Sequence, residues 1–440
     1  MMEHCEIIVS GGWFVDPCDG VREGLALTVQ GNRITALGPA AEIASRYHSE
    51  RHLDATDRIV LPGMINAHTH ASATLFRGYA PDVSGKAFFD RLWRIEALLD
   101  DEDVYVGALA GCLEMIRNGV TGFANHFSHM DQVARAVEET GIRAGLSRTM
   151  LDRGDESAAE HEVEEGVRFA ERWTNRCARI QPMLGPHAAY TCSDRLLRRA
   201  GDEARRTGLT LHVHVAESPH ERDLMLQRTG TSTVQHLRHL DFFSGNRVLG
   251  AHALYLDDAD LRFLSGCDFH AAICATGKMN RGQGIADLIR LQEAGINVCL
   301  GTDGSASDNL DVLMAMKVTH IAQNHLHQRA CALPPETILA MATANGARAL
   351  NWEMGRLAAG QLADFILVDA NRPHLRPLIT RPRSNLVFNI VYYATGADVD
   401  AVVIDGKVVM EQRHVLTVDE DEVLARLQRC AQSLWDRAAR

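Results

Sequence analysis

The sequence predicts an α/β protein, a (β/α)8 TIM barrel with a small β-sandwich built from both ends of the chain. The middle of the chain alternates short apolar runs with segments of helical spacing, and both ends carry short apolar runs divided by Gly, Asn and Asp. A length of 440 residues allows two or three domains, and 46% hydrophobic with 23% charged residues is typical of a globular protein. Wholesale disorder and a disulfide-dense mini-domain are therefore excluded.

The first and last parts of the chain have the sequence pattern of a small β domain, with short apolar runs separated by turn residues. Strands are predicted early at 7–10, 25–30 and 34–37, and late at 363–368, 401–404 and 407–410, the last two flanking an Asp-Gly turn. We expect residues 1–61 and 361–415 to form the discontinuous sandwich and residues 62–360 the barrel. Residues 416–440 are expected to form a C-terminal helix that packs on the sandwich.

Eight strand-like runs divide the middle of the chain: 61–67, 119–125, 142–147, 180–185, 209–215, 247–251, 269–274 and 296–302. Helical spacing lies between them, for example at 104–117, 196–206, 257–264 and 285–294. Eight such units suit a barrel of about 250 residues with insertions. A doubly wound open sheet is the alternative, but it would place a Gly-rich phosphate loop after its first strand, where this chain has Asn66-Ala67-His68-Thr69-His70.

The net charge and the cysteines indicate which classes of partner and which cellular compartment to expect. A net charge of −12 argues against nucleic acid or an anionic membrane as a partner. The 10 cysteines form no C-x-x-C pair, which favours buried reduced thiols. The N-terminus does not have the pattern of a signal peptide, and no apolar run reaches the roughly 18–20 residues that cross a bilayer. We expect a soluble, cytoplasmic protein.

Polar residues at the ends of four predicted strands point to a metal site. In a barrel, the carboxyl ends of the strands meet at one mouth. The first strand ends in His68 and His70, the fifth in His214, the sixth in His252 and the eighth in Asp303. The pair His68 and His70 alone is weak evidence, because a surface or core pair would explain it. Together with His214 and Asp303 it gives three nitrogens and a carboxylate, which suit Zn²⁺ with an open position for water, or Fe²⁺.

Four motifs carry a resemblance to a known family. They are residues 61–70, His214-Val215-Ala216-Glu217, Gly250-Ala251-His252 and residues 300–307. In this order they resemble the amidohydrolase superfamily, and within it the branch of triazine chlorohydrolases, guanine deaminase, and adenosine-type and S-adenosylhomocysteine deaminases. The similarity covers nearly the whole chain and includes residues 355–365.

The resemblance implies a role for each matching residue. His68, His70, His214 and Asp303 would hold one divalent metal, and His252 would orient the metal-bound hydroxide. Glu217 would pass a proton to a ring nitrogen, and His187 would bind substrate. A single metal is implied because no lysine ends the predicted fourth strand, where binuclear members carry a bridging lysine. A purely structural role is the alternative for two of these residues. Glu217 could be a carboxylate that stabilises the first turn of a helix, and His252 could be a hydrogen-bonded core histidine.

The implied activity is hydrolysis at a ring carbon of a small nitrogen heterocycle, with release of ammonia by an aminohydrolase. The same machinery could instead expel chloride, an alkylamine or sulfide, or open a cyclic amide. A catalytically silent binding barrel is the alternative outside enzymes. The family also implies a homodimer or higher homo-oligomer.

The chain departs from the family pattern in loops that face the predicted mouth. Residues 273–284 lack the usual histidine and proline and carry Lys278 and Arg281, in a chain with only four lysines. Arg148 follows the third strand. If these basic residues line the mouth, they favour a substrate with a carboxylate or other acidic group. The loop after the first strand lacks the family's ribose-binding carboxylate pattern, which makes a standard nucleoside doubtful.

Other histidines are weaker candidates. His126 and His129 follow the second strand and are equally consistent with the mouth and with an ordinary loop. His212 lies two residues before His214 and is expected to be a satisfied core histidine.

Overall fold

The computed structural model describes residues 2–83, 85–306 and 308–440 of the chain. Ser307, the last residue of the fourth predicted motif, lies outside the described residues. At the centre is a parallel sheet, and the α/β class is confirmed. Its strands are β10 (Met64–His70), β11 (Val120–Phe127), β12 (Arg143–Met150), β13 (Ile180–Pro186), β14 (Leu211–Val215), β15 (Val248–His252), β16 (Phe269–Ile273), β17 (Asn297–Leu300) and β18 (Asp303–Gly304).

This central sheet curls until its last strand meets its first. Its strands follow chain order from β10 to β17, and the short β18 then pairs with β10, so that Thr69 lies opposite Asp303. Only Gly301 and Thr302 separate β17 from β18. A side chain at residue 301 could not be accommodated, because a Cβ there would lie 2.8 Å from the His68 carbonyl oxygen. The Thr302 amide donates to the His68 carbonyl at 3.1 Å and to the Asn66 side chain at 3.0 Å, which fixes the closure.

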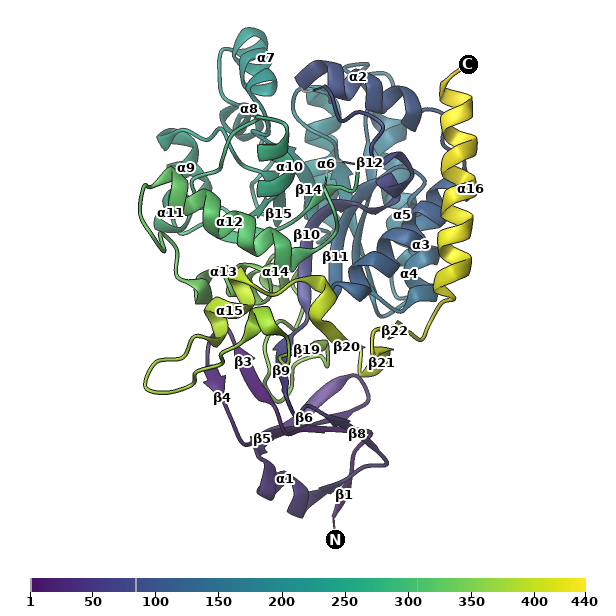
Figure 1. Ribbon diagram of the computed structural model, residues 1–440. Helices are drawn as coiled ribbons and strands as arrows, with labels where there is room; N and C mark the ends of the chain where they lie inside the picture. The colour runs from purple at the N-terminus through teal and green to yellow at the C-terminus, as the bar shows by residue number, and fades with distance from the viewer. Residues whose placement is uncertain (1, 84, 307) are drawn as a thin grey trace.

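Helices follow the strands and pack outside the sheet (Figure 1). Those that follow β10 to β17 are α2 (Gly85–Glu96), α3 (Asp101–Arg117), α4 (Met130–Thr140), α5 (Ala159–Trp173), α6 (Asp194–Thr207), α7 (Pro219–Thr229), α8 (Thr233–His239), α9 (Asp258–Leu264), α10 (Ala275–Asn280), α11 (Leu288–Glu293) and α12 (Val312–Leu326). Three shorter helices, α13 (Pro335–Met341), α14 (Ala344–Ala349) and α15 (Leu386–Tyr392), come after them.

The predicted C-terminal helix is present as α16 (Glu420–Ala438), but it does not pack on the terminal sheets. It lies along α3 and reaches α2, as the yellow helix in Figure 1 shows. The Trp435 indole donates to the Leu75 carbonyl at 3.0 Å and stands edge-on to Tyr79. The expected packing was wrong because the buried side chains of this helix, Val423 and Leu434, join the core of the central sheet.

Both ends of the chain contribute to the sheets below the central one. A seven-stranded sheet runs in the order β22-β21-β20-β19-β9-β3-β4 and a four-stranded sheet in the order β6-β5-β2-β8. Their strands are β2 (Ile7–Ser10), β3 (Trp13–Asp16), β4 (Gly20–Arg22), β5 (Leu25–Gln30), β6 (Arg33–Pro39), β8 (Arg51–Asp54), β9 (Arg58–Pro62), β19 (Phe365–Asp369), β20 (Val399–Ile404), β21 (Lys407–Glu411) and β22 (His414–Val415). Between β6 and β8 lie α1 (Ala40–Arg46) and β7 (Tyr47–His48), and β7 pairs with β1 (Glu3–His4).

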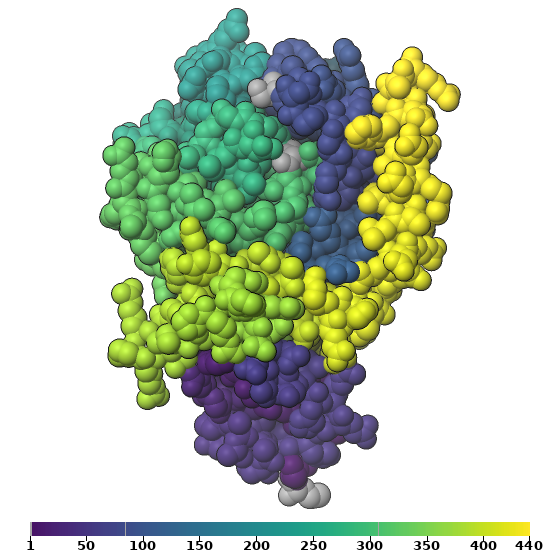
Figure 2. Space-filling model, in the orientation of Figure 1, coloured from purple at the N-terminus to yellow at the C-terminus, as the bar shows by residue number. Residues whose placement is uncertain are grey.

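The two terminal sheets share a core of their own. Phe14, Leu27, Ile34, Phe365 and Val403 are fully or almost fully buried in it. Figure 2 shows the yellow-green segment before β20 between the purple N-terminal part and the remainder of the molecule. The predicted β-sandwich and its domain boundaries stay predictions.

A buried ion-pair network ties the central sheet to the terminal part. Arg143, the first residue of β12, has a side chain only 4% exposed. Its guanidinium donates to both oxygens of Asp364, at 3.0 and 3.1 Å, and to Asp405 at 3.0 Å. Asp364 is also buried, so removing the arginine would leave a buried carboxylate unpaired.

No helix in the described ranges is long and apolar enough to cross a membrane. All ten cysteines are free thiols, and Cys18 and Cys331 are exposed rather than buried.

Arg143→Met should destabilise the protein by about 3–5 kcal/mol, the usual cost of breaking one side of a buried pair. Urea denaturation with a far-ultraviolet circular dichroism readout measures this. Arg290→Met serves as the control, because Arg290 pairs with Asp258 on the surface, where a pair contributes at most about 1 kcal/mol. Equal effects of the two substitutions would contradict a structural role for the buried network.

Candidate metal centre

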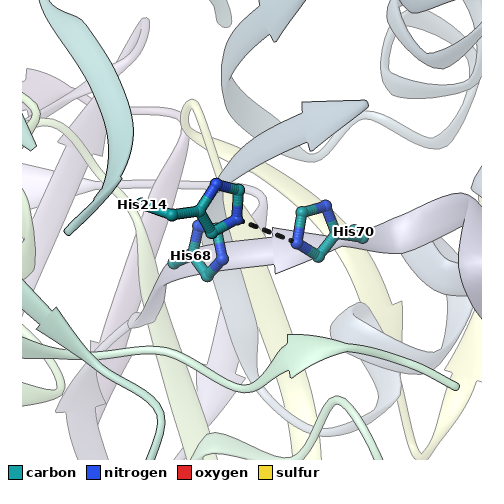
Figure 3. A group of neighbouring side chains, drawn as sticks. All are labelled: His68, His70 and His214. Carbon is teal, nitrogen blue, oxygen red and sulfur yellow. Dashed lines mark hydrogen bonds between the residues drawn. The ribbon is translucent and has the colours of Figure 1, made fainter. Parts of the chain in front are cut away.

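Five of the predicted site residues converge at the carboxyl end of the central sheet. His68 and His70 extend from β10 and meet His214 from β14 (Figure 3). The ligand atoms of these three residues lie within 4.8 Å of one another, and so do those of His68, His252 and Asp303. The two groups share His68, so the convergence predicted from four strand ends is present.

Hydrogen bonds fix which nitrogen of each imidazole carries the proton. His214 Nδ1 lies 2.8 Å from the His187 carbonyl oxygen, and His70 Nδ1 makes a short contact with the His126 carbonyl. A carbonyl only accepts, so both Nδ1 atoms must donate. In the neutral rings both Nε2 atoms are then bare. They face each other at 3.5 Å, the approach dashed in Figure 3, which leaves two lone pairs opposed unless a cation satisfies them.

A relay of hydrogen bonds gives His68 the same tautomer. The Ser147 hydroxyl donates to the Asn125 carbonyl at 2.8 Å, so its oxygen accepts from His212 Nδ1 at 2.9 Å. His212 Nε2 is therefore an acceptor, and His68 Nδ1 donates to it at 2.8 Å. His68 Nε2 is left bare and buried, with no hydrogen-bond partner among the described residues. His212 is thus the satisfied core histidine that the sequence predicts, and it also orients His68.

Electrostatics favour metal-binding protonation states in His68, His214 and Asp303. Burial lowers the pKa of His68 to about 4 and that of His214 well below its ordinary value. For Asp303, burial acts against the charge, but His252 and Lys278 outweigh it and hold the pKa well below its ordinary value. For His70, burial acts to lower the pKa, but the neighbouring Asp303 carboxylate outweighs burial and raises it, so a cation would have to displace a proton there. Neutral imidazoles and an ionised carboxylate are the forms that bind Zn²⁺ or Fe²⁺, and the bare His68 Nε2 needs such a partner. The residues therefore fit a divalent cation.

The backbone is unusual at three positions at or just beyond the ends of β14, β15 and β17. Ala216, His252 and Asp303 have φ angles of 51°, 81° and 64°, in the left-handed region that residues with a Cβ seldom adopt. Such conformations persist where the surrounding structure holds them, and they cluster at functional sites.

Glu217 lies beside the histidines and is enclosed by hydrogen bonds. Its carboxylate accepts from Tyr190 Oη at 2.8 Å and from Lys278 Nζ at 2.8 Å, and it lies 3.8 Å from His252 Nε2. Burial opposes its charge, but the Lys278 ammonium outweighs burial and lowers the pKa of Glu217. The Glu217 amide donates to Glu221 at 2.7 Å, near the start of α7, which holds this segment in place.

A cavity of about 260 Å³ opens above the histidines. His187, Lys278 and Arg281 line it, as their predicted substrate contacts require. Its wall is completed by aromatic and polar side chains from α2 and the strand ends, including Phe88, Phe89, Trp93, Glu96, His126 and Arg153. The position of His126 agrees with the mouth, whereas His129 pairs with Asp101 on the surface.

Arg148, a predicted substrate contact, is not brought to this cavity. Its guanidinium pairs with Glu162 of α5 at 3.0 Å. The reason is strand alternation, because Ser147 turns inward to His212 and its neighbour must therefore turn outward. Arg153, five residues later, lines the cavity instead.

Glu96 was not identified from the sequence. It is the last residue of α2 and lines the cavity, where burial raises its pKa to about 7. The available signal was an acidic residue that follows the apolar residues Leu92, Trp93 and Ile95 in the connection after the first strand.

His212→Leu should weaken metal binding about 10- to 100-fold, because His68 loses the acceptor that fixes its tautomer. Competition with a chromogenic chelator measures the affinity. The matched control is His270→Leu, the same change at another buried histidine that bonds to Asn297. If both variants bind metal as the parent protein does, the relay through His212 has no role.

Comparisons with known proteins agree with this geometry. The model of the amidohydrolase family matches residues 59–409. The 5'-deoxyadenosine deaminase of Methanosarcina acetivorans is 38% identical over 438 residues, which cover 98% of this chain and 99% of that protein. A 5-methylthioadenosine/S-adenosylhomocysteine deaminase of Pelotomaculum thermopropionicum is 40% identical over 423 residues, with 95% and 96% covered.

Solved structures show the same fold. An adenosine deaminase from Xanthomonas campestris with bound zinc has a TM-score of 0.93 at 25% identity, covering 99% of this chain and 100% of that one. Atrazine chlorohydrolase from Arthrobacter aurescens, complexed with zinc, has a TM-score of 0.87 at 20% identity, covering 97% and 100%, a likeness of fold alone. The relatives are deaminases, which confirms the prediction of a hydrolase acting on carbon–nitrogen bonds other than peptide bonds. With its family model matched over most of its length, the chain belongs to the amidohydrolase family.

Proposed function

We propose that this protein is a metal-dependent aminohydrolase that removes the amino group from an adenine-type ring and releases ammonia. The observation that carries the proposal is the set of bare, buried Nε2 atoms beside an ionised Glu217 at the floor of the cavity. The relatives named for 5'-deoxyadenosine and for 5-methylthioadenosine and S-adenosylhomocysteine support the adenine-type ring.

One divalent cation, Zn²⁺ before Fe²⁺, would be held by His68, His70, His214 and Asp303. When bound, such a cation lowers the pKa of water from about 15.7 towards 7 and so supplies hydroxide at neutral pH. His252, 1% exposed and within reach of both Asp303 and Glu217, would orient the attacking oxygen.

Two carboxylates would handle the protons. Asp303 is ionised and lies next to the metal-binding nitrogens, so it would accept one proton of the water that attacks the ring carbon and return it to the amino group, which leaves as ammonia. Glu217, ionised at rest, would take the other proton of the attacking water and pass it to the ring nitrogen beside that carbon. Its hydrogen bonds from Tyr190 and Lys278 hold the carboxylate in one orientation, which proton transfer over a hydrogen-bond length requires.

Glu96 would bind the sugar of a nucleoside. It faces the cavity from α2, beside the aromatic ring of Trp93, and a carboxylate accepts hydrogen bonds from neighbouring hydroxyl groups. The loop directly after the first strand lacks the expected sugar-binding pattern, but Glu96 supplies a carboxylate from later in the same connection.

A second candidate, expulsion of chloride or another group by the same machinery, gains no support from the chlorohydrolase, since that likeness is of fold alone. Ammonia release separates the two reactions. A homodimer or higher homo-oligomer and a cytoplasmic location stay predictions from the family resemblance and the composition.

The purified protein should carry about one equivalent of Zn²⁺ or Fe²⁺ per chain, because one set of four ligands converges. Elemental analysis measures the content. Dialysis against a chelator should abolish ammonia release from 5'-deoxyadenosine, and one equivalent of metal should restore it. Two tightly bound metals per chain would overturn the mononuclear assignment.

Glu217→Gln should lower kcat for 5'-deoxyadenosine by about 100-fold or more, because the amide keeps the shape and loses the proton transfer. Metal content should stay near that of the parent protein, which distinguishes this variant from His214→Ala, whose metal content should fall. Ammonia release and elemental analysis give the two readouts. A Gln variant with the parent rate would refute the proton-shuttle role.

A further inference from the structure

We propose that Lys278 and Arg281 select a heterocycle that carries an acidic oxygen on the ring carbon next to the nitrogen faced by Glu217. The inference rests on the proposed aminohydrolase function and adds to it the chemistry of the ring substituent.

Lys278 is placed at the reacting end of the cavity. It extends from the short helix α10 and is only 1% exposed, although lysine is almost never fully buried. Its ammonium lies 2.8 Å from Glu217 Oε2, the carboxylate proposed to face the ring nitrogen. Burying a charge in this position costs free energy unless the charge is paired. The groups around the Lys278 ammonium therefore indicate which ligand it would bind.

Arg281 converges on the same point from the end of α10. Its side chain is 8% exposed, and its guanidinium lies over the Phe88 ring at 3.9 Å from the centroid. Both Lys278 Nζ and Arg281 Nη2 are 3.9 Å from the same oxygen, Asp303 Oδ2. The two cations therefore flank one part of the cavity floor.

The charges at the floor balance only if an anion is added. Glu217, Asp303 and the hydroxide that the cation would supply contribute three negative charges, one more than a divalent cation neutralises. Lys278 and Arg281 then add two positive charges in a place that water reaches poorly, so one positive charge is left over. Farther out, Glu96 and Arg153 also line the cavity and offset each other when both are charged. A ligand with negative charge near the reacting carbon would remove this excess.

Hydrogen-bond complementarity places that charge on the ring. Glu217 would face the ring nitrogen to which it passes a proton, and Lys278 donates beside it, with the two groups 2.8 Å apart and both lining the cavity. Such a pair fits a ring nitrogen next to a carbon that bears an oxygen acceptor. In plain adenine this carbon carries only hydrogen, which gives the ammonium nothing to bind. A ring oxo group and a carboxylate substituent both supply the acceptor oxygen, and the carboxylate also brings the negative charge.

Three nucleosides that differ only at this carbon test the proposal: adenosine, 2-oxoadenosine and adenosine-2-carboxylate. The metal-loaded enzyme should prefer at least one oxygen-bearing compound to adenosine by ten-fold or more in kcat/KM, and the better of the two identifies the oxygen source. Lys278→Met should reduce that preference roughly 10- to 100-fold, the size of a lost charge-assisted hydrogen bond. Lys278→Arg should restore part of it, and Lys407→Met, an exposed lysine in β21, should leave the preference unchanged.

Binding gives a readout that does not depend on turnover. Xanthosine and inosine differ by the same ring oxygen, so calorimetry should show tighter xanthosine binding to the parent protein and a smaller difference in Lys278→Met and Arg281→Met. Turnover of adenosine with no preference for either oxygen-bearing compound would overturn this inference and leave the aminohydrolase function standing. Failure of the metal-loaded enzyme to release ammonia from all three nucleosides and from 5'-deoxyadenosine would count against the function itself.

Discussion

The site depends on hydrogen bonds made by the side of each imidazole that faces away from the cavity. His70 and His214 donate Nδ1–H to backbone carbonyls, and His68 donates to His212. Each bond fixes a tautomer and leaves a bare Nε2 directed at a shared point. In a dry interior, unpaired lone pairs of this kind carry a free-energy cost. A bound cation would remove that cost by accepting them. Sheet closure at Gly301 completes the set, because it brings Asp303 alongside β10.

Much of this arrangement could be predicted from the sequence, because parallel strands in a barrel leave local signals. Each central strand from β10 to β17 overlaps an apolar run, and polar residues such as His214 and Asp303 mark where the runs end. Three features of the structure could not be predicted, because they depend on residues other than those at the strand ends. To place Arg148, one must know which side chains of β12 face the inside of the sheet. The hydrogen bond between Ser147 and His212 shows this, and the sequence does not. Glu96 comes from the end of a helix, and the packing of α16 depends on which distant surface covers its apolar face.

The segment after β16 differs from the family pattern in sequence, and the structure shows what that difference does. The sequence identified Lys278 as an unusual residue without indicating what it contacts. The structure gives its partner, Glu217, and shows that the same lysine also approaches Asp303. One substitution relative to the family pattern therefore touches both carboxylates proposed to move protons. Such a change is expected to alter the choice of substrate together with the chemistry, since the two share the same atoms.

The position of Lys278 also decides how charge is divided between two adjacent buried glutamates. Glu217 and Glu221 are both buried, and the Glu217 amide bonds to the Glu221 carboxylate. Two carboxylates this close are unfavourable if both are ionised. Lys278 stabilises the charge on Glu217, whereas burial and then the Glu217 charge raise the pKa of Glu221 to about 7. The lysine thus keeps the negative charge on the carboxylate that faces the cavity, and leaves its neighbour to hold the backbone of that segment in place.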